Sequence, residues 1–324
     1  MHTIQELATI VNNRIKNLDI YREPHELYTP ISYTLEGSGK RLRPVLTMMV
    51  CEMYDGEIND AINPALGIEI FHNFTLLHDD IMDEAPIRRG RDTVYKKWSP
   101  NVAILSGDTM FAIAYDFVCK TKDKFVPAIM KSFCRTSIEV CEGQQYDMNF
   151  EEEEDTTIPE YLNMIRLKTA VAVATSMEIG AIIAEAPQTQ ITKIYQFGEH
   201  LGMAFQLQDD LLDSFGDQEK FGKRIGGDIL ANKKTYIYLK ALEIASEEQR
   251  KTLKELYMSK DHDPDEKIKK VKAIFSALDI PSVTNKLIND YFDKAMACYE
   301  ELSPKEEKKQ ILKEFAYMIL RRDK

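Results

Sequence analysis

Leu76-Leu-His-Asp-Asp-Ile-Met-Asp83 and Gln206-Leu-Gln-Asp-Asp-Leu-Leu-Asp213 carry the same Asp-Asp-x-x-Asp pattern, and each closes a long apolar run. On a helix of about 3.6 residues per turn, the first and last aspartates of the pattern share a face, one turn apart. Clustered carboxylates repel one another and are costly to bury without a compensating cation. Neither motif contains Lys or Arg, so the pattern predicts a divalent cation with oxygen ligands, for which Mg²⁺ is best suited. We expect two acid-bearing helix ends that face each other across one cavity.

His72 precedes the first motif on the same predicted helix. It lies about 20° from the face of Asp79 and about 10 Å away along the helix axis. A lone histidine on an apolar helix is usually a core residue with a satisfied hydrogen bond, but this alignment favours a place in the site. A single acidic motif is likewise typical of a solvated helix end, whereas two copies favour a metal site.

Cationic loops accompany the acidic helices. Gly37-Ser-Gly-Lys-Arg-Leu-Arg-Pro44 is a glycine-rich turn that enters a helix, where backbone amides favour an anion. Arg88-Arg-Gly-Arg91 follows the first motif, and Gly222-Lys-Arg-Ile-Gly-Gly-Asp228 and Asn232-Lys-Lys-Thr235 follow the second. Arginine binds phosphate through paired hydrogen bonds and lysine as a point charge. Together with the carboxylates, these loops predict two diphosphate sites.

The rest of the chain is expected to be all-α. Apolar residues recur at helical spacing, and no sustained alternation predicts a strand. Helices are expected over residues 3–18, 30–36, 42–54, 61–83, 102–121, 126–148, 159–184, 188–215, 234–245, 246–257, 264–278, 281–302 and 304–320. Pro30, Pro159 and Pro304 each come soon after a hydroxyl residue, which is typical of a helix start. No Pro/Ser-rich linker divides the chain, so residues 1–324 are expected to form a single domain.

Composition narrows the class of function. A net charge of −11 argues against nucleic acid as a partner, because nucleic-acid-binding proteins usually carry a basic surface. The five cysteines lack metal-ligand spacing, which is typical of a reducing compartment. The N-terminus lacks the layout of a signal peptide, and no apolar window is long enough for a membrane span. We therefore expect a soluble cytoplasmic protein.

In combination, these motifs resemble those of the all-trans (E-type) polyprenyl diphosphate synthases over essentially the whole chain. The stretches that carry the resemblance are residues 39–44, 76–83, 88–90, 143–147, 168–169, 205–213 and 222–235. The resemblance implies an orthogonal bundle of about a dozen helices around a deep central cavity, commonly in a homodimer. It implies a prenyltransferase that condenses isopentenyl diphosphate with dimethylallyl, geranyl or farnesyl diphosphate and releases diphosphate.

The resemblance also assigns roles to single residues. It implies three Mg²⁺ ions held by Asp79, Asp83 and Asp209, with Asp80, Asp210 and Asp213 in support. It assigns the allylic diphosphate to Arg88, Lys168, Lys223 and Lys233, and isopentenyl diphosphate to Lys40, Arg43, His72 and Arg89. Lys168, Thr169 and Gln206 would surround the developing carbocation, and Gln144 and Asp147 would support them. The basic C-terminus, Arg321-Arg-Asp-Lys324, is similar to a tail that closes over isopentenyl diphosphate in some members.

Product length is expected to depend on the turns before Asp79, where Phe71, Phe74 and Thr75 lie. In the family, bulk at the fourth and fifth positions before this motif limits the product. Here the fifth is Phe74 and the fourth is the small Thr75, without the insertion of bacterial farnesyl enzymes. This resembles geranylgeranyl synthases and favours a twenty-carbon product over the fifteen-carbon alternative. Phe74 could equally be a core residue, about 140° from Asp79 around the helix.

Three other functions remain open at this point. A class I terpene cyclase shares the fold and first motif but normally replaces the second motif with a mixed Asn/Ser/Glu site. A non-catalytic partner subunit of a prenyl synthase would usually lose aspartates from one motif. An acidic cation-binding bundle would ignore isoprenoid diphosphates. The complete second motif, with Lys40, Arg43 and His72, favours the synthase.

Overall fold

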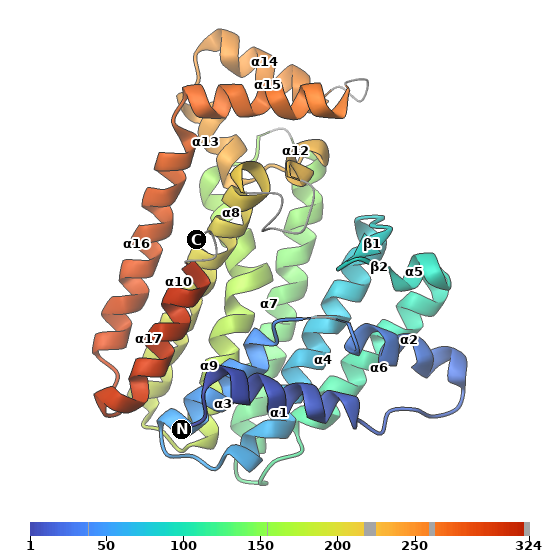
Figure 1. Cartoon of the computed structure of the whole chain (residues 1–324), viewed down its shortest axis with the longest axis vertical. Helices are drawn as coiled ribbons and strands as arrows, with labels where there is room; N and C mark the ends of the chain where they lie inside the picture. Colours follow the sequence, from blue (N-terminus) through green and yellow to red (C-terminus); the bar gives the residue numbers. More distant parts are fainter. Residues whose placement is uncertain (38, 154, 217–224, 259–262, 321–324) are drawn as a thin grey trace. The chain divides into compact units, whose positions relative to one another are not determined.

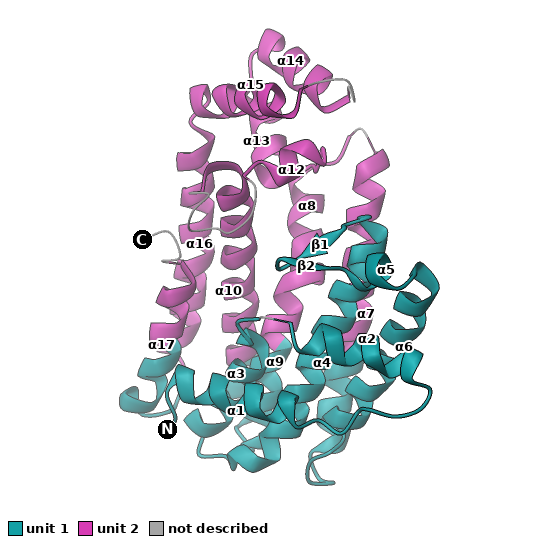
Figure 2. Ribbon diagram, turned by 45° about the vertical axis from the view of Figure 1, so that its right-hand side comes forward, with its two compact units in different colours: residues 1–134, 175–192, 303–312 teal, residues 135–174, 193–302, 313–324 magenta. Residues whose placement is uncertain are grey.

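The chain folds almost entirely into helices (Figure 1). A computed structural model describes residues 1–37, 39–153, 155–216, 225–258 and 263–320. The all-α prediction is confirmed. The chain divides into two compact units, each assembled from three segments and coloured separately in Figure 2. Unit 1 contains Met1–Cys134, Thr175–Thr192 and Ser303–Leu312; unit 2 contains Arg135–Ala174, Lys193–Leu302 and Lys313–Lys324.

Unit 1 is built around the long helix that carries the first acidic motif. Its elements are α1 (Ile4–Lys16), α2 (His25–Leu35), α3 (Leu42–Met53), α4 (Ile58–Met82), β1 (Ile87–Arg88), β2 (Arg91–Asp92), α5 (Val94–Lys97) and α6 (Pro100–Val118). Helix α4 packs chiefly against α6 and α3. A Cβ at Gly67 would lie 2.8 Å from the carbonyl oxygen of Ala114, so only glycine permits this close crossing of α4 and α6. These contacts hold α4 in place, and the aspartates of the first motif lie at its C-terminal end.

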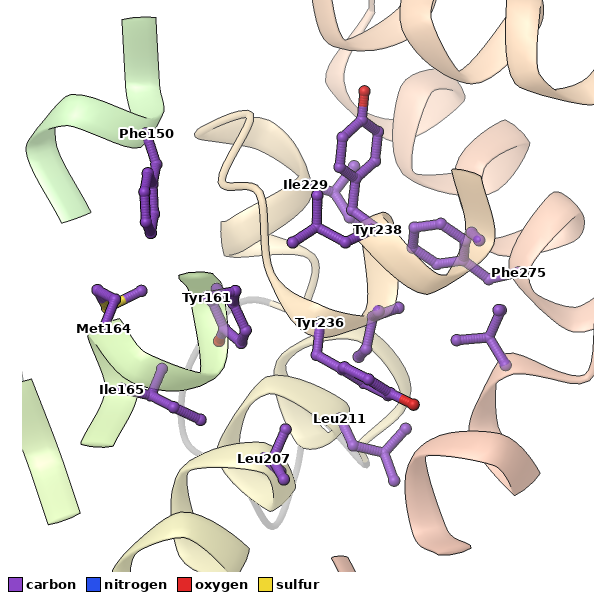
Figure 3. Close-up of a cluster of buried hydrophobic side chains, with 14 of the residues drawn as sticks. Phe150, Tyr161, Met164, Ile165, Leu207, Leu211, Ile229, Tyr236, Tyr238 and Phe275 are labelled. Carbon is purple, nitrogen blue, oxygen red and sulfur yellow. The ribbon is translucent and has the colours of Figure 1, made fainter. Parts of the chain in front are cut away.

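Unit 2 carries the second acidic motif near the end of α10. The remaining elements are α7 (Val126–Glu152), α8 (Ile158–Ile165), a π-helical turn η1 (Arg166–Ala170), α9 (Val171–Ile183), α10 (Gln188–Phe215), α12 (Gly227–Leu230), α13 (Tyr236–Ile244), α14 (Glu247–Met258), α15 (Pro264–Ala277), α16 (Ile280–Glu300) and α17 (Glu306–Leu320). By sequence, α7, α9, α10 and α17 contribute residues to both units. Figure 3 shows the core of unit 2, where Tyr161 of α8 and Leu207 and Leu211 of α10 belong to one buried cluster.

Most predicted helices are present, with two informative differences. Thr157 caps α8 in a capping box with Glu160, as the hydroxyl before Pro159 predicted. Pro30, however, lies inside α2, which begins at His25, so the predicted start there was wrong. Pro30 is the sixth residue of α2, so its ring removes the hydrogen bond that an amide there would donate to the Glu26 carbonyl, and the helix nevertheless continues to Leu35. The predicted helix over residues 159–184 is interrupted by η1.

Candidate active site

The first acidic motif occupies the C-terminal end of α4. Asp80 is buried, Asp79 is partly buried and Asp83 is exposed. Arg88 Nε donates to Asp80 Oδ1 at 2.5 Å, and its Nη2 lies 3.7 Å from Asp79 Oδ2. Burial raises the pKa of Asp80 to about 6, although Arg88 acts to lower it. Neither Lys nor Arg lies within the motif itself, but Arg88 folds back onto it from the following hairpin, which belongs to the cationic loop that the sequence placed there.

A tight hairpin places Arg88. Arg89 and Gly90 both have positive φ, 52° and 75°, as the two-residue turns that suit twisted antiparallel strands require. This turn pairs Arg88 with Arg91 across the two strands. The Arg91 guanidinium lies 3.8 Å from the ring centroid of Tyr33, whose hydroxyl donates to the Asp92 carbonyl at 2.9 Å. Helix α2 thereby anchors the hairpin that carries Arg88.

A second set of basic groups surrounds His72 in unit 1. Burial holds the pKa of His72 well below its usual value, and Arg43, Arg89, Arg88 and Arg41 lower it further. Burial also lowers the pKa of Arg43 and that of Arg89. Arg43 Nε is buried without a hydrogen-bond partner among the described residues. Such an orphaned donor amid positive charge fits a bound anion.

Two of these basic groups, Arg88 and Arg89, border a small cavity in unit 1. The cavity measures about 60 Å³, and its lining includes Asn73, Asp80, Arg88 and Arg89. Lys40 is exposed on the turn before α3. Arg41, by contrast, is buried in an ion pair with Glu69, so the turn offers fewer exposed cations than its sequence indicated.

The second acidic motif is held by a different set of contacts. The Tyr161 hydroxyl donates to Asp210 Oδ2, and Gln206 Nε2 donates to Asp210 Oδ1 at 3.0 Å. Burial and Asp228 raise the pKa of Asp210 to about 8, although the hydrogen bonds from Tyr161 and Gln206 act to lower it. Asp213 Oδ2 accepts the Asp228 amide at 2.9 Å, so this aspartate fixes the start of α12. Sequence reasoning missed Tyr161, which lies outside the recognised motifs.

The π-helical turn η1 presents Lys168 and Thr169. Lys168 Nζ donates to Asp147 Oδ2 at 2.6 Å, and Thr169 Oγ1 donates to Gln206 Oε1 at 3.0 Å. Gln206 therefore joins Thr169 to Asp210. These five residues and Lys233 belong to the lining of a cavity of about 120 Å³ in unit 2.

Two glycines let neighbouring helices approach this turn. A Cβ at Gly143 on α7 would lie 2.4 Å from the Lys168 amide nitrogen, and one at Gly202 on α10 would lie 2.7 Å from Ala170 Cα. Both distances are shorter than any packed side chain tolerates. The turn is therefore confined on two sides by backbone, which fixes where Lys168 and Thr169 lie.

The product-length candidates belong to an aromatic cluster in unit 1. Phe71 is 3% exposed, and its ring contacts those of Phe74, Phe111 and Phe133. Phe74 also contacts Phe111, with ring centroids 5.1 Å apart. The Thr75 hydroxyl donates to the His72 carbonyl at 2.8 Å. Phe74 thus packs in the aromatic cluster and lies five residues before the acidic motif.

The candidate residues fall into two described groups and one remainder. Unit 1 contains Lys40, Arg43, Phe71, His72, Phe74, Thr75, Asp79, Asp80, Asp83, Arg88 and Arg89; unit 2 contains Gln144, Asp147, Lys168, Thr169, Gln206, Asp209, Asp210, Asp213 and Lys233. Lys223 and the tail Arg321-Arg-Asp-Lys324 lie outside the described residues.

Within the described ranges, no group of three or more His, Cys, Asp and Glu side chains is arranged to hold a metal ion. No helix there combines the length and apolar character that a membrane crossing requires.

Comparison with known proteins identifies the family. A sequence model of polyprenyl synthetase matches residues 24–275. The chain belongs to the polyprenyl synthetase family. A short chain isoprenyl diphosphate synthase from Methanocaldococcus jannaschii is 39% identical over 245 residues, covering 75% of this chain and 74% of the relative. A geranylgeranyl pyrophosphate synthase from Geoglobus acetivorans is 41% identical over 243 residues, covering 74% and 76%. A solved geranylgeranyl pyrophosphate synthase matches with a TM-score of 0.95 and 45% identity, covering 100% of both chains.

As a polyprenyl synthetase, the chain is a prenyl-transferring enzyme. The family resemblance predicted from the motifs is confirmed. Members of the family generally depend on a metal, which agrees with the carboxylate chemistry of the two motifs. Membership also excludes a purely cation-binding bundle.

Proposed function

We propose that the chain condenses isopentenyl diphosphate with an allylic diphosphate to give a short-chain all-trans prenyl diphosphate, chiefly the twenty-carbon geranylgeranyl product. The observation that carries this proposal is the second set of basic groups in unit 1, which surrounds His72. Arg43 has an orphaned buried donor beside a neutral His72 and Arg89, apart from Arg88, which pairs with the aspartates. A terpene cyclase, which acts on one diphosphate, has no use for this additional cluster.

The two acidic motifs fit Mg²⁺. This ion usually takes only one or two protein carboxylates and fills its shell with water and substrate phosphate oxygens. Asp79, Asp83 and Asp209 would hold the ions, three in number, with Asp80, Asp210 and Asp213 in support. When bound, the ions neutralise charge on the departing diphosphate. The hydrogen bonds to Asp210 and the amide held by Asp213 are consistent with this supporting role.

The basic residues divide between the two diphosphates. Arg88, Lys168, Lys233 and Lys223 would bind the allylic diphosphate; Lys40, Arg43, His72 and Arg89 would bind isopentenyl diphosphate. A neutral His72 retains a ring N–H with which to donate to a phosphate oxygen. Arg88 already contacts Asp79 and Asp80. It would therefore bind the same allylic diphosphate as the metal ions that the aspartates hold.

The chemistry consists of ionisation, bond formation and proton loss. The carbon–oxygen bond of the allylic diphosphate breaks with the electron pair leaving on oxygen, and fixed cations stabilise that charge. Thr169 and Gln206, joined by a hydrogen bond of 3.0 Å, would direct oxygen atoms toward the allylic cation. The double bond of isopentenyl diphosphate attacks the cation, and the departed diphosphate takes the proton. Gln144 and Asp147 support the arrangement, Asp147 through Lys168.

We further propose that the enzyme acts as a homodimer in the cytoplasm. Ile104 and Leu105 are 44% and 60% exposed on α6, an apolar pair that a second copy would cover. All five cysteines are free, as a reducing compartment would keep them.

The direct test incubates the purified protein with labelled isopentenyl diphosphate, Mg²⁺ and each of the dimethylallyl, geranyl and farnesyl starters. We expect linear products that end at twenty carbons. An end at fifteen carbons would support the farnesyl alternative. A cyclic hydrocarbon from one diphosphate would favour a cyclase, and no turnover without a second protein would favour a non-catalytic partner subunit.

A further inference from the structure

Arg41 points into unit 1 instead of joining the basic surface of its loop. It is 5% exposed. Its Nη1 donates to Glu69 Oε1 at 2.7 Å, and its Nη2 donates to the carbonyls of Leu35 and Gly37 at 2.7 and 2.9 Å. Its Nε lies 3.3 Å from Asn12 Oδ1. One guanidinium therefore joins α1, the end of α2 and α4 to the residue that starts α3.

Glu69 is a fixed anchor for this guanidinium. It is 3% exposed on α4, and its Oε1 also accepts the Asn73 amide at 3.1 Å. His72 follows one turn later on the same helix. The Glu69 carboxylate also acts on Arg43 and Arg89, whose pKa values it raises against the lowering effect of burial. The anchor thus lies on the same helix as His72, the histidine that the proposed function assigns to the anion.

The backbone at Arg41 depends on these contacts. Its φ is 51°, in the left-handed region, and among the described residues no side chain caps the start of α3. Left-handed backbone is unfavourable for a residue with a Cβ and persists only when its surroundings impose it. A cavity of about 390 Å³ borders Arg41, with Ile15, Ile20 and Leu35 in its lining. Because apolar packing is incomplete on this side, the polar contacts of Arg41 hold the turn.

We propose that Arg41, anchored by Glu69, is a positioning residue for isopentenyl diphosphate. It lies between Lys40 and Arg43 in the chain and sets the backbone from which both side chains extend. It does not itself touch the diphosphate, because its donors are engaged with protein acceptors. This inference rests on the proposed function, which assigns Lys40, Arg43 and His72 to that diphosphate.

Arg41→Lys tests the proposal because lysine keeps the charge opposite Glu69 but cannot reach the same four acceptors. We expect the KM for isopentenyl diphosphate to rise about tenfold or more, as when an outer-shell partner of a binding group is lost. The KM for the allylic diphosphate and kcat at saturating substrate should change less than about twofold, because the proposed role concerns only the binding of isopentenyl diphosphate. Glu69→Gln, which keeps the size and an acceptor, should give a smaller rise in the same KM.

A stability control separates positioning from general weakening. Met48 on α3 is fully buried, and Met48→Ala should lower Tm by as much as Arg41→Lys while leaving the KM for isopentenyl diphosphate unchanged. If Met48→Ala reproduces the selective rise, or if Arg41→Lys raises both KM values equally, the positioning role is contradicted. If Arg41→Lys does not fold, an unchanged or lowered KM in Glu69→Gln contradicts it.

A second comparison separates this proposal from the proposed function. Arg43→Ala removes a group assigned to the diphosphate itself. If Arg43→Ala leaves the KM for isopentenyl diphosphate unchanged, the proposed site is wrong. If Arg43→Ala raises that KM and Arg41→Lys does not, the site stands and only the positioning role of Arg41 falls.

Discussion

His72 lies among arginines, and its imidazole stays neutral because burial and these charges hold its pKa well below the usual value. In the unfolded chain a histidine takes up a proton below about pH 6.5. The unfolded state therefore binds more protons than the folded state in mildly acidic solution, and folding stability falls as the pH drops through this range. The folded site therefore favours an uncharged His72.

Replacing His72 by glutamine removes this titration. Between pH 7.5 and 5.5 the wild type should lose about 1 kcal/mol more of its unfolding free energy than His72→Gln. Urea unfolding at several pH values measures both curves. Parallel curves for the two proteins would show that His72 takes up its proton in the folded state as readily as in the unfolded chain.

Phe74 is the residue on which the product-length prediction depends. Phe74→Ala shortens the side chain five residues before Asp79 and should shift products beyond the wild-type length, as sizing of labelled products would show. Phe125→Ala is the control, since Phe125 is a phenylalanine in unit 1 that is buried but lies outside the aromatic cluster. An unchanged product profile in Phe74→Ala would assign Phe74 to the core alone.

At the level of elements, η1 is the feature that sequence reasoning could not predict. The apolar pattern over residues 159–184 is continuous, and periodicity alone does not distinguish an α-helix from one that contains a π turn. The turn depends on close approach of α7 and α10 at Gly143 and Gly202, which are tertiary contacts. By contrast, the motifs containing Lys168 and Gln206 were recognisable because their residue types and order are specific.

Gly143→Ala tests the confinement of this turn. The new Cβ would lie 2.4 Å from the Lys168 amide nitrogen, so η1 or α7 must shift. We expect a loss of about 1–3 kcal/mol of stability, as for overpacking, and a fall in kcat of about tenfold or more, because small misplacements near reacting groups are costly. Gln145→Ala, at an exposed position two residues along α7, should keep both values. Normal kcat in Gly143→Ala would show that the turn tolerates displacement.

At the level of the whole molecule, the motifs predicted the family, but sequence could not show which charges neutralise each other. Arg88 was assigned to a diphosphate, and the structure shows it paired with Asp80 through a hairpin whose turn needs positive φ at Arg89 and Gly90. Arg41 belongs to a loop that was expected to supply cations to a diphosphate, whereas tertiary contacts engage it with Glu69. That the two units form one domain stays a prediction.

The proposed homodimer follows from exposed apolar groups on α6. Leu105→Glu places a charge where Leu105 is 60% exposed and should shift the mass in light scattering toward a single chain of 37.3 kDa. Burying an unpaired charge in an interface is strongly unfavourable. A dimer that is unaffected by this change would place the interface elsewhere, and a wild-type monomer would contradict the homodimer.

The central claim is that both aspartate motifs serve the ionisation of the same diphosphate. The most direct measurement is a double-mutant cycle on kcat with Asp79→Asn, Asp209→Asn and the combined variant. Residues that act as a unit give strongly non-additive losses, so each single variant should lose about a thousandfold or more and the double variant little beyond that. Wild-type turnover in either single variant, or losses that multiply fully in the double variant, would contradict the account.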